Sequence, residues 1–174
     1  MAYSYTDSRI MPKQSIASIV STTAAVPVGT IVRAKDPTLG EGEFIYLPTT
    51  ASITQYNIVS YRQTASGNYI NVRSVSGTGS GQAIAVAQAT GAASCFGWFQ
   101  IAGISPVLKT AVIVSANKPA YVSATAGRVK QIASTGRGII GMVLTGKGNA
   151  AGSAASANLS TVYATFNRPA QIAS

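Results

Sequence analysis

Turn-forming residues interrupt this chain at intervals too short for a long helix. Runs rich in Val, Ile, Tyr and Thr alternate with Gly, Pro, Asn and Ser along the 174 residues, a pattern typical of β-strands joined by turns. In "YINVRSV" (69–75), for example, Tyr69, Asn71 and Arg73 share one face. The pattern predicts strands at 29–34, 43–47, 57–62, 69–75, 83–89, 95–101, 107–114, 120–124, 128–132, 139–144 and 158–166.

One stretch, "GQAIAVAQATGAA" (81–93), competes with this interpretation because its alanines favour helix. Its glycine-rich flanks suit a hairpin equally well, and we assign it to a strand. Many short, closely spaced strands predict an all-β fold, a sandwich or a small barrel. The length fits a single domain.

Two segments lie outside the predicted β core. Residues 1–26 are rich in Ser and Thr and precede Pro27, and we interpret them as an extended N-terminal arm ahead of a β domain at 27–174. An Ala/Ser/Gly-rich stretch at about 146–158 is interpreted as a mobile loop. The arm is expected to lie on a surface, either of its own domain or of a partner, because it carries apolar anchors: Tyr3, Tyr5, Ile10, Met11, Ile16, Ile19 and Val20.

Charge is distributed unevenly along the chain. All four acidic residues precede residue 44, where they balance four basic residues, so the net charge of +9 arises between residues 44 and 174. A surface of this kind attracts nucleic acid, acidic proteins or lipid headgroups. The basic residues are spread singly rather than gathered in a run, which weakens a nucleic-acid interpretation: Arg62, Arg73, Lys109, Lys118, Arg128, Lys130, Arg137, Lys147 and Arg168.

The residue inventory argues against an enzyme. The chain has no histidine, which excludes Ser-His-Asp and Cys-His arrangements. Glycosidase chemistry needs two carboxylates in contrasting environments, and a short loop holds Asp36, Glu41 and Glu43 together. A single cysteine, Cys95, excludes an internal disulfide, and the carboxylate spacing does not match a calcium loop. We expect no catalytic residues, no cofactor and no metal.

Two glycine-rich stretches resemble phosphate-binding loops without completing them. "SGTGSGQ" (76–82) has Gln82 where a dinucleotide-binding turn needs glycine, and no acidic residue follows to hold a ribose. "GMVLTGKG" (141–148) has Gly148 where a magnesium-binding Ser or Thr belongs. Hairpin turns explain both. Trp98, in "CFGWFQIAG", is expected to pack in a core strand rather than to stack on bases, because no Lys or Arg lies near it.

Nothing in the sequence indicates a membrane protein. The longest strongly apolar stretch, 139–144, is far shorter than the ~20 residues of a spanning helix. The first residues lack the basic start and apolar run of a signal peptide. We therefore expect a soluble protein made in a reducing cytoplasm.

The stretch "AKDPTLGEGEFIYLP" (34–48) holds three of the four acidic residues. Pro37 fixes the backbone after Asp36, while Gly40 and Gly42 permit tight turns. A loop shaped in advance loses little entropy on docking, so its carboxylates are candidates for pairing with bases on a partner. The alternative is an internal turn whose acids pair with Arg33 and Lys35 of the same chain.

Four segments together resemble the decoration, or cement, proteins of tailed-bacteriophage capsids: "VPVGTIVRAKDPTLGEGEFIYLP" (26–48), "GWFQIAG" (97–103), "AYVSATAGRV" (120–129) and "FNRP" (166–169). The resemblance spans most of the chain in the same order. It implies a non-enzymatic β domain on the outer surface of an icosahedral phage head, where it bridges and stabilises major capsid protein subunits, often as a homotrimer. It implies localisation in the virion.

On this interpretation the capsid contacts come from the arm and the loop: Tyr3, Tyr5, Arg9, Met11, Lys35, Asp36, Glu41 and Glu43. Two alternatives stay open. A basic β-barrel that binds nucleic acid would use Arg62, Arg73, Arg128, Lys130 and Arg137, and its affinity would fall steeply with salt. A minor tail or fibre component would occur in few copies per particle.

Overall fold

A computed structural model describes residues 3–5, 14–73, 81–110, 113–146 and 161–171. The described part is all-β, as predicted, and contains no helix. Its strands are β1 (Ser4–Tyr5), β2 (Ile31–Asp36), β3 (Gly40–Pro48), β4 (Ile58–Gln63), β5 (Tyr69–Arg73), β6 (Ala83–Ala87), β7 (Phe96–Leu108), β8 (Lys118–Val122), β9 (Val129–Lys130), β10 (Gly138–Gly146) and β11 (Thr161–Gln171).

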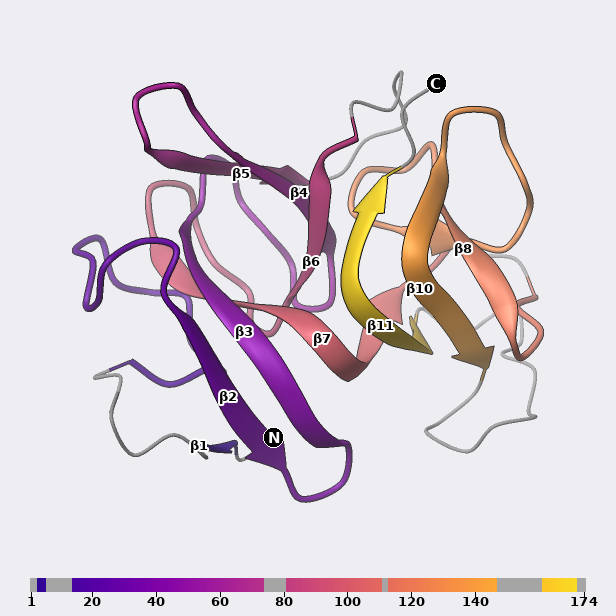
Figure 1. Cartoon of the computed structure of the whole chain (residues 1–174), viewed down its shortest axis with the longest axis horizontal. Coiled ribbons are helices and arrows are strands. Elements are labelled where there is room, and N and C mark those ends of the chain that lie inside the picture. The colour runs from indigo at the N-terminus through magenta and orange to yellow at the C-terminus, as the bar shows by residue number, and fades with distance from the viewer. Residues whose placement is uncertain (1–2, 6–13, 74–80, 111–112, 147–160, 172–174) are drawn as a thin grey trace.

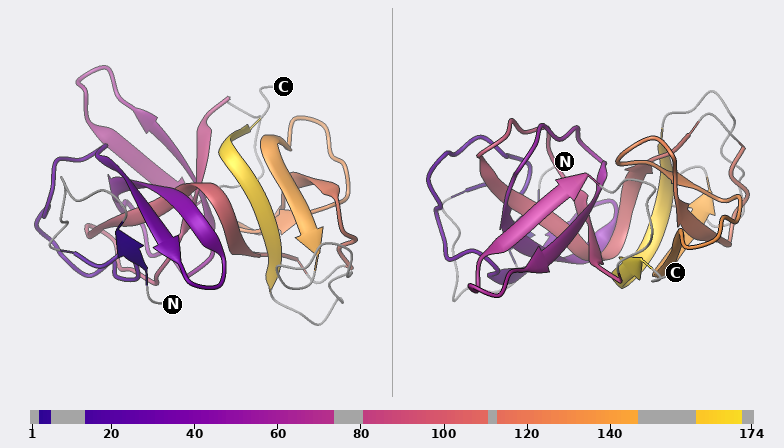
Figure 2. Two further views of the ribbon diagram at one scale, coloured as in Figure 1. Left: turned by 60° about the horizontal axis from the view of Figure 1, so that its bottom comes forward. Right: turned by 90° about the horizontal axis from the view of Figure 1, so that it is seen from above.

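The named strands pair antiparallel in the order β1-β2-β3-β7-β6-β11-β10-β8-β9, with the β4–β5 hairpin attached through β6. Among the described strands no pairing joins β1 to β9, so the sheet stays open and the sandwich is favoured over the barrel. Figure 1 shows β1–β5 grouped on one side and β8, β10 and β11 on the other. In both views of Figure 2 the two groups lie side by side, and β7 runs from the first group to β11 of the second.

Strand β7 connects the two groups. Its first half pairs with β3, from Pro48↔Phe96 to Glu43↔Ala102, and its second half pairs with β11, from Ala102↔Asn167 to Leu108↔Thr161. The change of partner coincides with Gly103, whose φ is +106°. A Cβ there would lie 2.6 Å from the carbonyl oxygen of Glu41. Only glycine therefore fits where the strand passes from one partner to the other.

The expectation of two separate strands at 95–101 and 107–114 was wrong. Gly103 and Pro106 resemble strand breakers in the sequence, but one strand of 13 residues runs through both. The reason is that β11 takes over the pairing of β7 as β3 leaves it. The stretch 83–89, assigned to a strand against its alanine content, is confirmed as one over 83–87.

The core forms three clusters of buried side chains. One lies between β4, β6, β7, β8, β10 and β11, and a second includes Leu47, Ile53 and Phe99. The third surrounds Trp98, which is fully buried, as predicted for a core strand. Its indole N–H donates to the Gln14 carbonyl at 3.2 Å, and its ring lies 4.9 Å from that of Tyr46. A buried ring of this kind offers no surface for stacking on bases.

Several described residues of the N-terminal segment pack on its own domain. Strand β1 pairs with β2, and Ile16 and Ile19 are only 1% exposed. Ser21 bridges to Phe96, while Val20 faces solvent. The sequence left open whether this segment lies on its own domain or on a partner. Its described residues contact its own sheet. Ile10 and most of the loop expected at 146–158 lie outside the described residues.

Candidate functional site

The β2–β3 hairpin places the acidic residues of the 34–48 stretch in three different environments. Asp36 is 2% exposed, and one of its carboxylate oxygens accepts hydrogen bonds from the backbone N–H groups of Thr38 (2.8 Å) and Leu39 (2.9 Å). It closes the turn, as Asp commonly does at the first position of a tight turn. Its side chain is therefore used inside the protein and does not point outward as a contact residue.

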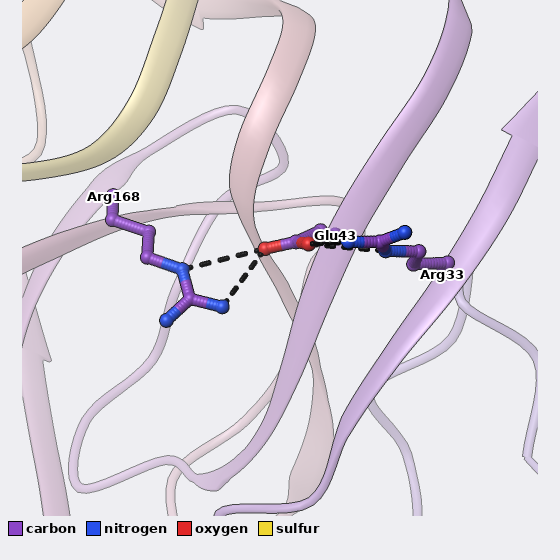
Figure 3. Close-up of polar contacts among 3 residues, drawn as sticks. All are labelled: Arg33, Glu43 and Arg168. Atoms are coloured by element: carbon purple, nitrogen blue, oxygen red, sulfur yellow. Dashed lines mark hydrogen bonds and ion pairs between the residues drawn. The ribbon is translucent and has the colours of Figure 1, made fainter.

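Glu43 lies between two arginines, as Figure 3 shows. Arg33, from β2, donates through Nε and Nη2 to Oε1 at 3.1 and 3.0 Å. Arg168, from β11, donates through the same two nitrogens to Oε2 at 3.4 and 3.1 Å. Part of the alternative interpretation, that the acids pair within the chain, therefore holds for Glu43 and Arg33.

This arrangement sets the protonation state of Glu43. Partial burial raises the pKa of the carboxyl, but the hydrogen bonds and charges of Arg168 and Arg33 outweigh it, so the pKa is lowered from its ordinary value. Glu43 thus stays ionised at neutral pH. This is the opposite of the shift that a proton-donating glycosidase acid needs, so Glu43 does not fit that role.

Arg168 lies in an irregular part of β11. Its pairing with β10 jumps from Ile140↔Ala170 to Met142↔Phe166, leaving three residues of β11 opposite Gly141. Within this bulge Arg168 has a φ of +44°, a left-handed conformation that costs a residue with a Cβ about 1–2 kcal/mol. The bulge turns the guanidinium toward β3, as bulges commonly redirect side chains.

The ion pairs with Glu43 offset little of the backbone strain at Arg168, because they are exposed. The side chains of Arg33 and Arg168 are 70% and 61% exposed, against 19% for Glu43. Exposed pairs contribute about 0–1 kcal/mol each. Each guanidinium also keeps its Nη1 nitrogen outside the contact with Glu43, so both arginines retain donors for a further acceptor.

A hollow of about 390 Å³ opens beside these residues, at the bend of β7. It is lined by Arg33, Glu41, Gly42, Glu43, Ala102, Gly103, Asn167 and Arg168. The lining residues come from four strands: the β2–β3 hairpin, β7 and β11. The hollow is the place where the predicted contact residues Glu41 and Glu43 come together.

Lys35 and Glu41 face each other across the hairpin, in register and both exposed. No ion pair links them, and within the described part of the chain Glu41 has no salt-bridge partner. Both side chains thus point to solvent at the hairpin end.

Tyr3, predicted as a contact residue, is used inside the protein. Its hydroxyl donates to Oε1 of Gln88 at 2.9 Å, and its ring lies edge-on to Phe44 with centroids 5.2 Å apart. Burial, reinforced by the charge of Asp36, raises its pKa well above the ordinary value. Gln88 in turn donates to Gln100 and Ser105, so Tyr3 covers a buried polar network at the bend of β7.

The other predicted contacts of the arm are Tyr5, Arg9 and Met11. Tyr5 lies in β1 opposite Ala34. Arg9 and Met11 lie outside the described residues.

The five basic residues of the nucleic-acid alternative are not gathered in one place. Arg62 and Arg73 belong to the β4–β5 hairpin. The other three flank β8: Lys130 pairs with Tyr121, and the carbonyls of Arg137 and Arg128 accept from the backbone N–H groups of Val122 and Ser123. Arg128 donates to the carbonyl of Lys109 at 3.0 Å, and Lys130 donates to the Ser134 hydroxyl at 2.7 Å. Lys109 itself is buried, and burial lowers its pKa. The five residues are therefore divided between two parts of the described fold.

Two further features are absent from the described residues. They contain no group of three or more potential metal ligands. They also contain no helix long and apolar enough to span a bilayer.

Sequence reasoning missed Arg168 as a site residue. It lies 125 positions from Glu43, and neither periodicity nor motif spacing connects residues so far apart. The left-handed backbone at Arg168 has no sequence signal, because it arises from the pairing offset between β10 and β11.

Comparison with known proteins gives no family for this chain. No family model matches it, and no curated protein matches it either. The resemblance to capsid decoration proteins thus rests on the residues quoted above.

Proposed function

We propose that the protein is a non-enzymatic cement protein that binds the outer surface of an icosahedral phage head and stabilises the major capsid protein subunits it bridges. In this proposal it acts as a homotrimer in the virion. The four quoted segments support the assignment by resemblance. The physical observation that supports it is a described surface with little available negative charge on a chain with an excess of basic residues.

Little negative charge remains available on the described surface. Asp36 is buried in its turn, and Glu43 is neutralised by two arginines. Glu41 is the described acid left at the surface without a salt bridge. From residue 44 onward the chain carries nine basic residues and no acid. Such a surface complements an acidic protein lattice, and long-range attraction speeds its association.

The copy number per particle tests this proposal. The protein is quantified against the major capsid protein in nuclease-treated, gradient-purified particles of the virus that encodes it. A ratio approaching one per capsid subunit is expected. A handful of copies would instead assign it to the tail or portal, and absence from particles would overturn the proposal.

The arm requires a separate test, because truncating it also removes Tyr3 from its contacts with Gln88 and Phe44. We therefore propose replacing Arg9 and Met11 with alanine and leaving Tyr3 in place. If the arm contacts the capsid, affinity for the shell and the heat resistance of the decorated particle both fall. Unchanged values for both would remove the arm from the contact surface.

The nucleic-acid alternative makes a different prediction. Duplex DNA would bind with an affinity that falls steeply as salt rises. Replacing Arg62 and Arg137 with glutamine would then weaken DNA binding, while a cement protein keeps its shell affinity after nuclease treatment.

A further inference from the structure

The hollow at the bend of β7 combines features that its role in folding does not explain. Arg168 takes a backbone conformation that glycine adopts without strain. Its ion pair with Glu43 is largely exposed and therefore weak. An arginine at this position thus brings the fold little net stability, and its remaining donors are directed away from Glu43 (Figure 3).

Glu43 contacts both arginines before any partner arrives and so restricts part of their freedom. A long, flexible side chain normally loses conformational entropy when it binds, and an arginine already held by a carboxylate has less to lose. The hollow of about 390 Å³ beside them has room for an inserted side chain. Positioned donors beside an open hollow are the arrangement expected of a recognition site.

We propose that this hollow binds a carboxylate side chain, Asp or Glu, presented by a protein segment, with Arg168 as the main contact and Arg33 as the second. In Arg168, Nε and one N–H of Nη2 already face Glu43. The other edge of the guanidinium, Nη1 with the second N–H of Nη2, still offers two parallel donors that match the two oxygens of a carboxylate. This inference rests on the proposed function in one respect: it takes the partner segment to belong to the major capsid protein.

The charges around the hollow favour a protein segment over nucleic acid. Glu41 and Glu43 both line it, so the four charged side chains of the hollow sum to zero. A nucleic acid would bring successive phosphates beside these carboxylates, and like charges so close repel. A protein segment can offer a single carboxylate to Arg168 and a neutral or basic side chain to Glu41.

Substitutions of Arg168 separate recognition from folding. In Arg168→Gly the backbone strain is relieved and the ion pair is lost, so the melting temperature is expected to stay close to that of the wild type. Binding to nuclease-treated shells that lack this protein is expected to weaken about tenfold or more, which corresponds to about 1.4 kcal/mol. Arg168→Lys keeps the charge without the fork and is expected to recover binding only in part.

The matched control is Arg137→Gln, which removes one positive charge in the turn before β10, outside the residues that line the hollow. It is compared with Arg168→Gln at two salt concentrations. A general charge effect would weaken both variants equally, and that result would overturn the site. A specific site predicts a larger loss for Arg168→Gln that persists at the higher salt concentration.

The remaining outcomes separate the two proposals. If the wild-type protein does not bind the shells, the proposed function fails and the inference fails with it. If the wild type binds and the Arg168 variants bind equally well, only the inference fails. If Arg168→Gln instead weakens binding to duplex DNA, the hollow recognises phosphate and the assignment to a protein segment is overturned.

Discussion

Gly103 provides the most direct test of how the two groups of strands are joined. In Gly103→Ala the new methyl group would lie 2.6 Å from the Glu41 carbonyl oxygen and about 3.0 Å from the Gln100 amide nitrogen. Its positive φ costs about 1–2 kcal/mol. Displacing the backbone of β3 adds about 1–3 kcal/mol, the usual range for overpacking. The expected loss of unfolding free energy is therefore about 2–5 kcal/mol.

Gly40→Ala is the matched control. Gly40 also has a positive φ, +82°, but a Cβ there would meet nothing within 4 Å. It is expected to cost about 1–2 kcal/mol from strain alone. Both substitutions restrict the unfolded chain to the same extent, so the difference between them reports the close approach of β3 and β7.

Urea denaturation followed by circular dichroism measures both losses, and calorimetry gives the melting temperatures. A domain of this size loses about 2–4 °C per kcal/mol, so Gly103→Ala is expected to melt about 10 °C below the wild type. Equal losses for the two variants would refute the described contact between β3 and β7 at the bend.

Three further predictions concern buried or paired side chains. Glu43→Gln is expected to lower the free energy of unfolding by about 1 kcal/mol at pH 7. Because the folded pKa of Glu43 is lowered, this difference in stability from the wild type should shrink as pH falls below about 4. Urea titrations at several pH values measure it. Tyr3→Phe removes the hydrogen bond to Gln88 and should lower the free energy of unfolding by about 1 kcal/mol. Since the folded pKa of Tyr3 is raised, the wild type should lose its extra stability over the variant as pH rises above about 10. Equal alkaline destabilisation of the two proteins would contradict this prediction. Trp98→Phe opens a cavity and removes the indole donor from the Gln14 carbonyl. Together these changes should lower the free energy of unfolding by about 2–4 kcal/mol, measured by thermal melting. In the wild type, iodide should fail to quench the fluorescence of this fully buried indole.

The sequence predicted the strands better than their partners. Alternation and turn residues located nearly all the strands, because both signals are local. The burial of Trp98 followed from its apolar neighbours. The pairing of β7 with two successive partners was missed, because Gly103 and Pro106 have the same sequence signature in a strand break and in a bend.

The candidate site was only partly predictable for the same reason. Glu43 and Arg33 lie on adjacent strands of one hairpin, so their pairing was among the alternatives. Arg168 reaches Glu43 only because β11 pairs with β7, and Asp36 turns inward only because a backbone N–H needs an acceptor. The first fact is not carried by residue type or spacing, whereas the second could have been anticipated, because Asp commonly closes a tight turn in this way.

The double role of β7 also has a thermodynamic consequence. A strand that belongs to both groups cannot lose its partners on one side without exposing apolar side chains of the other, since Phe99 and Val107 lie on the same strand in different clusters. The two groups should therefore unfold as one cooperative unit rather than as separate foldons. Amide hydrogens of β3 and β10, at opposite sides of the molecule, should then exchange through the same global opening and show the same limiting protection.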